Sequence, residues 1–153
     1  MKALVISSAL LALVSSPALA SACFGADEMK SVRIRQLQTE LMVAALKCSY
    51  HANLDLSGRY NVFIDRFGPQ VSRNNKTLQG HFQKVHGKEW QRRFDGFVTR
   101  LANDASDRSQ TIPDYCPTSA KLYDTVMAMD FREMSAFASS SLPPAPGVSA
   151  CKP

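Results

Sequence analysis

The sequence predicts an all-α domain, a small antiparallel four-helix bundle stapled by two disulfides. Apolar residues recur at three- and four-residue steps over four stretches, which is typical of the buried stripe of a helix. Good helix formers dominate the chain after its first 20 residues, whereas glycine and β-branched residues are few. The chain has four cysteines and opens with a segment typical of an export signal, a combination that favours disulfide bonds.

Residues 1–20 have the pattern of a secretory signal peptide. Lys2 gives a positive start, residues 3–14 are almost wholly apolar, and Ala18-Leu19-Ala20 is a small-x-small cleavage site. The apolar run is too short to cross a bilayer about 30 Å thick as a helix, and no later segment is apolar enough to do so. Removing 20 of the 153 residues leaves 133 and lowers the net charge from +5 to +4, because Lys2 is the only charged residue removed. We therefore expect a periplasmic or secreted protein that begins at Ser21.

Cys23 allows an alternative interpretation of the N-terminus. The sequence Ala20-Ser21-Ala22-Cys23 loosely resembles a bacterial lipoprotein site, where a diacylglycerol would anchor the protein through Cys23. Leucine usually stands three residues before such a cysteine, and here Leu19 stands four residues before it. A lipoprotein anchored through Cys23 is therefore the second expectation for localisation.

The first two helices are expected over about residues 27–48 and 58–85. One apolar stripe follows the first helix from Ile34 to Cys48, and the polar residues lie largely off that stripe (Arg33, Arg35, Gln36, Gln38 and Glu40). Gly68-Pro69 interrupts the second stretch. Because proline removes an interior hydrogen bond but fits a first helical position, we expect the second helix to be kinked or split there.

The third helix is expected over about residues 88–106 and the fourth over about 118–139. The third has a seam of apolar residues four and three apart, and Arg100 can pair with Asp104 on its outer face (Trp90, Phe94, Phe97, Leu101 and Ala105 form the seam). Either Thr118 or Ser119 can cap the fourth, whose inward residues are expected to be Leu122, Val126, Met129 and Phe137. Residues 140–153 hold four prolines and are expected to form a tail, so the bundle domain spans 21–139.

Up-down-up-down order of the four helices predicts how the cysteines pair. Cys48, at the end of the first helix, and Cys116, before the fourth, meet at one pole, while Cys23 and Cys151 meet at the other. A bond between Cys23 and Cys48 would have to span a helix of roughly 30 Å, against a Cα separation of about 6 Å in a disulfide. The remaining pairing, Cys23–Cys116 with Cys48–Cys151, would join opposite poles of the bundle. We therefore expect bonds Cys48–Cys116 and Cys23–Cys151, in a structural role.

Catalytic and metal-binding patterns are absent from the sequence. It has no nucleophile elbow, no His-Glu-x-x-His and no phosphate loop, so we expect no enzyme and no catalytic residues. His51, His81 and His86 are expected at the surface or in loops, and no two cysteines have the spacing of a zinc site, so no metal or cofactor is expected. The alternative function is a carrier of haem or another small ligand in the bundle interior, with histidine or Met127 and Met129 as ligands.

Basic residues gather in the middle of the chain. Between Arg73 and Arg100 there are seven basic and two acidic residues, around the turn from the second helix to the third. Such a corner attracts polyanions or acidic protein surfaces, and its candidate partner-binding residues are Lys84, Lys88, Arg92 and Arg93. We expect a non-enzymatic exported accessory or interaction protein of the bacterial cell envelope that contacts an envelope protein or anionic polymer. No nucleic acid is expected, because exported bacterial proteins seldom meet it.

Several runs of sequence resemble a known group of proteins. They are residues 36–48, Tyr60-Asn61-Val62-Phe63, residues 97–103 and Tyr115-Cys116. Together these runs are similar to small exported proteins of α-proteobacteria, over roughly residues 30 to 130. The resemblance implies a bacterial, exported and helical protein, and it assigns no site residues.

Overall fold

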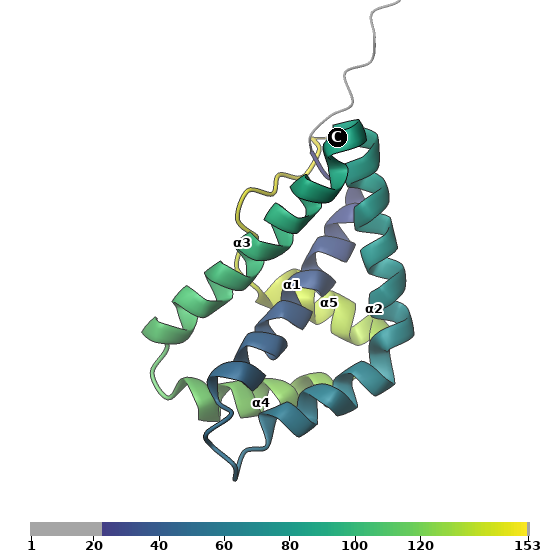
Figure 1. Ribbon diagram of the computed structural model, residues 1–153. Coiled ribbons are helices and arrows are strands. Elements are labelled where there is room, and N and C mark those ends of the chain that lie inside the picture. The colour runs from purple at the N-terminus through teal and green to yellow at the C-terminus, as the bar shows by residue number, and fades with distance from the viewer. Residues whose placement is uncertain (1–22, 153) are drawn as a thin grey trace, which may run out of the picture.

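The computed structural model describes residues 23–152, so the signal peptide expected at 1–20 lies outside the described residues. Within residues 23–152 the regular structure is helical, apart from one isolated β-bridge between Phe24 and Ala150. Figure 1 shows the elements in chain order: α1 (Ala26–Lys47), α2 (Leu56–His86), the 3₁₀ helix η1 (Gly87–Glu89), α3 (Trp90–Thr111), α4 (Tyr115–Met127) and α5 (Phe131–Ser141). The expected all-α fold is confirmed.

Helix α1 lies at the centre of the molecule and contacts each of the other four α-helices (Figure 1). It is therefore buried on more sides than the single expected stripe, and three of its polar residues are buried: Ser31, Gln36 and Thr39. Each has a hydrogen-bond partner, as buried polar groups require. The Ser31 hydroxyl lies 2.9 Å from Asn74 Oδ1, and Thr39 donates to a backbone carbonyl one turn earlier. The expectation that Gln36 lies off the buried surface is wrong.

The stretch expected as one fourth helix is two helices, α4 and α5. Asp130 ends the connection between them, because its side chain accepts a hydrogen bond from the Glu133 backbone amide. The Glu133 side chain accepts one in return from the Asp130 amide, and both distances are 2.8 Å. This reciprocal capping box starts a new helix. At the other end α4 begins at Tyr115 with Asp114 as its N-cap residue, so Thr118 and Ser119 are not caps as expected.

Helix α2 is one continuous helix, with Pro69 in its interior. It is therefore not split at Gly68-Pro69, which was one of the two expected forms. In Figure 1 its first half runs obliquely across the molecule and its second half rises toward the end where the chain termini lie.

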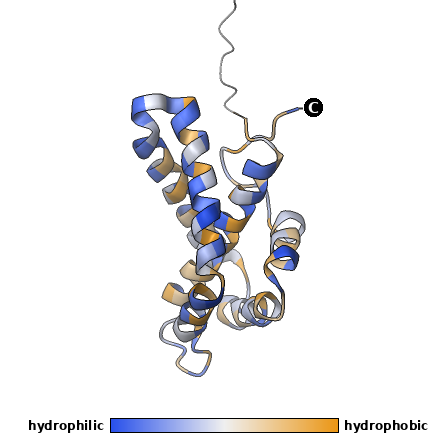
Figure 2. Cartoon of the chain, turned by 90° about the vertical axis from the view of Figure 1, so that its right-hand side faces the viewer, coloured by the Kyte–Doolittle hydropathy of each residue, from blue (hydrophilic) through white to orange (hydrophobic). Residues whose placement is uncertain are grey.

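Two clusters of buried side chains form the core. The larger cluster joins α1, α2, α4 and α5, and its largest fully buried member is Tyr123. The smaller one joins the start of α1, the last turns of α2 and the first half of α3, around Phe82 and Phe97. Phe97 and Leu101 of the expected third-helix seam are buried there, with Trp90 and Phe94 half-buried at its edge. Figure 2 shows hydrophobic residues where the helices meet and hydrophilic residues along the upper part of the α2–α3 hairpin.

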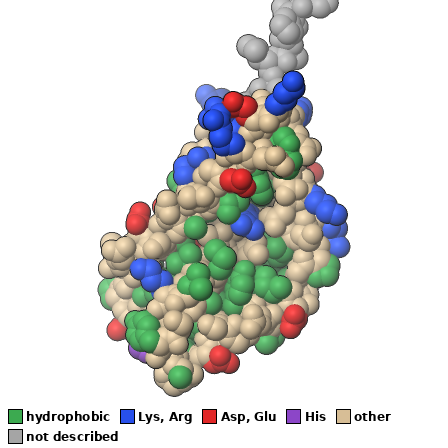
Figure 3. All heavy atoms as spheres, in the orientation of Figure 1, with side chains coloured by type: hydrophobic (Ala, Val, Ile, Leu, Met, Phe, Trp, Pro, Cys, Tyr) green, Lys and Arg blue, Asp and Glu red, His purple; other side chains and the backbone are tan. Residues whose placement is uncertain are grey.

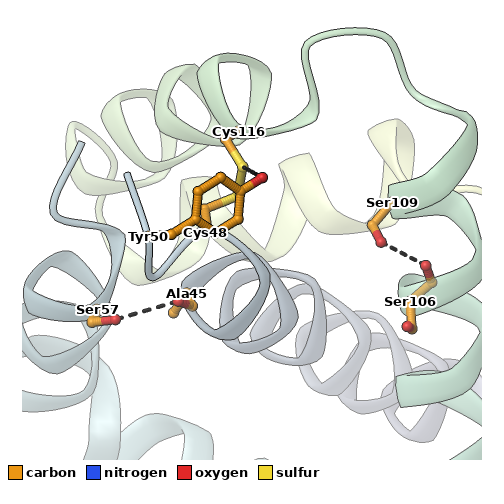
Figure 4. The surroundings of a disulfide bond; sticks show 7 residues. All are labelled: Ala45, Cys48, Tyr50, Ser57, Ser106, Ser109 and Cys116. Atoms are coloured by element: carbon orange, nitrogen blue, oxygen red, sulfur yellow. Dashed lines mark hydrogen bonds between the residues drawn. A yellow bond between two sulfur atoms is a disulfide. The ribbon is translucent and has the colours of Figure 1, made fainter. Parts of the chain in front are cut away.

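Both expected disulfides are confirmed. Cys48 is bonded to Cys116 and Cys23 to Cys151, with Cα separations of 5.6 Å and 4.9 Å. Figure 4 shows the first bond, which joins the end of α1 to the first turn of α4, with the ring of Tyr50 in front of it in this view. Each bond closes a long loop, of 68 and 128 residues, and the chain-entropy model gives each about 4–5 kcal/mol of stabilisation.

Arg108 links α3 to α1. Its guanidinium pairs with Glu40 of α1 and with Asp104, one turn earlier on α3. Burial raises the pKa of Glu40 above its usual range, and the charge and hydrogen bond of Arg108 oppose that rise. Since Asp104 pairs with Arg108, the expected pair between Arg100 and Asp104 is wrong.

Replacing Tyr123 with Phe should lower the free energy of unfolding by about 1 kcal/mol. The Tyr123 hydroxyl is buried and donates a 2.7 Å hydrogen bond to the Leu41 carbonyl, which ties α4 to α1. Tyr50→Phe is the matched control, because the Tyr50 ring is exposed and its hydroxyl is 4.0 Å from Cys116 Sγ. Chemical denaturation measures both. Equal losses in the two variants would contradict the role given to Tyr123.

Candidate functional site at the basic end of the α2–α3 hairpin

The turn between α2 and α3 gathers basic side chains at one end of the molecule. Gly87 ends α2 with a φ of 51°, a conformation that glycine adopts without strain, and η1 leads directly into α3. All four expected partner-binding residues lie here and are exposed; we call them the basic apex (Lys84, Lys88, Arg92 and Arg93). Figure 3 shows Lys and Arg side chains around this end of the molecule. The expected partner-binding residues are thus brought together.

The basic region expected from Arg73 onward does not form one corner. Arg73 and Lys76 are exposed on the middle of α2, and eight residues separate Lys76 from Lys84. A helix rises about 1.5 Å per residue, so roughly 12 Å separate these two positions along the axis. The basic apex is therefore smaller than the sequence pattern indicates.

Glu89 is the carboxylate that pairs with cations of the apex. Its Oε2 lies 2.7 Å from Arg92 Nη2 and 3.6 Å from Arg93 Nη2. The hydrogen bond from Arg92, and then its charge, lower the pKa of Glu89, so Glu89 stays ionised at neutral pH. No carboxylate among residues 23–152 pairs with Lys84 or Lys88. The apex therefore keeps a net positive charge.

A buried histidine lies beneath the apex. His81 Nδ1 is 2.9 Å from Glu28 Oε2, and that oxygen also accepts a 2.8 Å hydrogen bond from the Gly25 amide at the start of α1. The Phe24 ring stacks on the imidazole with centroids 4.1 Å apart. The expectation that His81 lies at the surface is wrong, because Phe24 and the first turn of α1 cover it. His86 is half-buried in the last turn of α2, and His51 is half-buried in the loop after α1.

The two ends of the described chain, near Cys23 and Cys151, close this end of the molecule. Residues 142–151, which we call the C-terminal strap, hold no helix but pack against the core through the buried Ala145. The Phe24 backbone amide donates a 2.9 Å hydrogen bond to the Ser149 carbonyl, and the Phe24 carbonyl accepts a 3.0 Å hydrogen bond from the Cys151 amide. Both bonds lie beside the Cys23–Cys151 disulfide. The tail expected after residue 140 is thus an ordered part of the fold. Since the Cys23 sulfur is bonded to Cys151, it cannot carry a lipid in this form.

Two open pockets flank the last turns of α2. The first, of about 420 Å³, lies between the Cys23–Cys151 bond and α2 and is lined in part by Glu28, His81 and Lys84. The second, of about 380 Å³, lies on the side of α3 and is lined by Phe82, His86, Arg92, Arg93, Gly96 and Arg100. Both volumes fall within the usual range for small-molecule sites. Sequence reasoning missed both pockets, because each depends on how separate segments pack: the chain ends against α2 in the first pocket, and α2 against α3 in the second.

Other candidate ligand groups are scattered. Within the described residues no group of three or more His, Cys, Asp or Glu side chains is placed to hold a metal ion. Met127 and Met129, the candidate haem ligands, are half-buried against the larger core cluster, far along the chain from any of the three histidines. His51 lies beside the exposed ring of Tyr50, with ring centroids 4.3 Å apart.

The chain matches none of the family models, curated proteins or solved structures with which it was compared.

Removing the Cys23–Cys151 bond should release the C-terminal strap while the helices stay folded. The double variant Cys23→Ser with Cys151→Ser keeps the apolar contacts of Ala145 but frees the chain end, so hydrogen exchange should rise at residues 142–152. The matched double variant at Cys48 and Cys116 should instead raise exchange where α1 ends and α4 begins. Exchange at residues 142–152 that rises no more than exchange in the helices of the first variant would contradict this local role.

Proposed function

We propose that this protein is a non-enzymatic accessory or interaction protein of the bacterial cell envelope, which binds an anionic polymer or an acidic partner through the basic apex. The observation that carries the proposal is the gathering of four exposed cations at one end of the α2–α3 hairpin, of which Glu89 pairs with only two, Arg92 and Arg93. Clustered charge of one sign concentrates oppositely charged partners and speeds their association.

Two properties support a location outside the cytoplasm. Both disulfides join residues of the same chain, and disulfides persist in oxidising compartments. The sequence pattern of residues 1–20 supports export to the periplasm or beyond. Within residues 23–152 no helix combines the length and apolar character needed to cross a membrane.

The scaffold that we propose for this function is an antiparallel bundle of α1 to α4, with α5 packed against α1. We propose further that Gly68-Pro69 produces the change of direction seen along α2 in Figure 1, because proline removes a backbone hydrogen bond. The bend would direct the last turns of α2 toward the start of α3 and so place the basic apex at the narrow end.

Replacing Glu89 with Gln should strengthen binding to an anionic surface. The change frees Arg92 and Arg93 from their ion pairs, so vesicles of phosphatidylglycerol and phosphatidylcholine should hold the protein to a higher salt concentration. Asp95→Asn is the control, because Asp95 is exposed on α3 and its loss changes the net charge by the same amount. An equal effect of both variants would assign the binding to net charge alone.

Charge reversal at three apex residues should abolish binding. With Lys88, Arg92 and Arg93 all changed to Glu, affinity for the same vesicles should fall on the order of a hundredfold or more, at about 1 kcal/mol per basic residue lost. The matched control reverses three exposed cations elsewhere, Arg73, Lys76 and Lys121, and changes the net charge equally. Co-sedimentation across a salt gradient measures binding, and circular dichroism checks the fold. Equal losses in both triple variants, or retention that is insensitive to salt, would reject the proposal.

A further inference from the structure

The pocket between α2 and α3 lies beside the basic apex and shares Arg92 and Arg93 with it. Phe82 and His86 form its wall on the α2 side, with ring centroids 5.6 Å apart. Helix α3 supplies the opposite wall from three successive turns: Arg92 and Arg93, then Gly96, then Arg100. Residues three and four apart share one face of a helix, so these side chains meet on one side of α3.

The charge of the lining has one sign. It holds three guanidinium groups and one imidazole, and no carboxylate or lysine. Guanidinium groups present paired N–H donors that match two oxygens of a phosphate, whereas an ammonium is a point charge. The pocket therefore selects for a phosphate group more sharply than the exposed lysines of the apex would.

Arg100 lines the pocket and is not neutralised by a carboxylate. Among residues 23–152 the Arg100 side chain has no ion pair. Asp104, one turn later on α3, pairs with Arg108 instead. Two glycines lie beside it: a Cβ on Gly96 would be 3.6 Å from Arg100 Nη1, and one on Gly147 would be 3.5 Å from its Nε. The guanidinium thus lies between the surface of α3 and the C-terminal strap.

Gly96 keeps the pocket open. Glycine in a helix interior costs about 1 kcal/mol relative to alanine, and φ at this position is not in the left-handed region, so the helix itself does not require glycine. A side chain here would project from the face that carries the arginines. Because Gly96 has no side chain, room is left among the three guanidinium groups.

We propose that this pocket binds the dianionic phosphate group of a phosphomonoester. The inference rests on the proposed function, since it names the anionic group that the basic apex recognises. Arg92, Arg93 and Arg100 donate to the phosphate oxygens, and the Phe82 and His86 rings face the molecule that carries the phosphate. On binding, Arg92 and Arg93 exchange their exposed ion pairs with Glu89, which are worth little in water, for bonds to a doubly charged ligand.

Calorimetric titration with inorganic phosphate, at constant ionic strength in chloride, tests the pocket directly. The wild-type protein should bind phosphate with one site per chain, and Arg100→Gln should weaken binding about tenfold or more, because hydrogen bonds to charged groups contribute about 1.5–3 kcal/mol. Arg73→Gln removes an exposed cation outside the pocket and should leave the affinity unchanged. Absence of phosphate binding to the wild type, or equal losses in these two variants, would overturn the proposal.

Gly96→Leu separates the pocket from the charge of the apex. The leucine fills the pocket and removes no cation, so phosphate binding should be lost while retention on phosphatidylglycerol vesicles persists. Gly80→Leu is the matched control, since a Cβ at Gly80 of α2 would meet no atom within 4 Å. Phosphate affinity equal in the two leucine variants would overturn the pocket and leave the proposed function standing. The proposed function would stay supported if vesicle retention is lost only in the variant with Lys88, Arg92 and Arg93 reversed and persists in both leucine variants.

A second set of vesicles distinguishes the sources of the phosphate. Phosphatidic acid carries a phosphomonoester and phosphatidylglycerol a phosphodiester, so vesicles matched in surface charge isolate the headgroup. Tighter retention on phosphatidic acid that Gly96→Leu removes would assign the site to a lipid headgroup. Equal retention on both lipids, with phosphate binding intact in solution, would assign it to a soluble phosphomonoester.

Discussion

The bond between Cys23 and Cys151 is the constraint on which the basic end of the molecule depends, because it joins the two ends of the described chain. It holds Phe24 against the smaller core cluster, where the ring covers His81. Glu28 then binds the imidazole from the first turn of α1. The start of α1, the last turns of α2 and the C-terminal strap therefore form one packed unit, and the cations of the apex project from it.

The use of cations differs between the two ends of the molecule. Away from the apex, two arginines of α2 join it to α4: Arg59 binds Asp124, and Arg66 donates to the backbone carbonyls of Met127 and Met129. These arginines bind helix-end carbonyls and a carboxylate at the surface of the fold. At the apex, Lys84 and Lys88 make no ion pair within residues 23–152, and Arg92 and Arg93 share one carboxylate, Glu89. The apex is the candidate contact surface because it gathers four exposed cations, of which Glu89 pairs with two.

The sequence was sufficient to predict the helical class, the cysteine pairing and the apex cations, because each depends on local periodicity or on helix order. It did not predict the break before α5, although Asp130 and Glu133 are a recognisable capping pair. The break was missed because the apolar pattern continues on both sides of it. The burial of Gln36 and His81 was missed for another reason. The C-terminal strap covers Gln36, and Phe24 covers His81; each covering segment is distant in the chain from the residue that it covers. The α2–α3 pocket likewise depends on how two helices pack.

Peptide mapping of the unreduced native protein tests the arrangement of the chain most directly. The account predicts two crosslinked peptide pairs, one that joins Cys23 to Cys151 and one that joins Cys48 to Cys116. A crosslink between Cys23 and Cys48 would place the two ends of α1 together, and free thiols at all four positions would leave the chain ends unjoined. Either result would contradict the fold on which the basic apex stands.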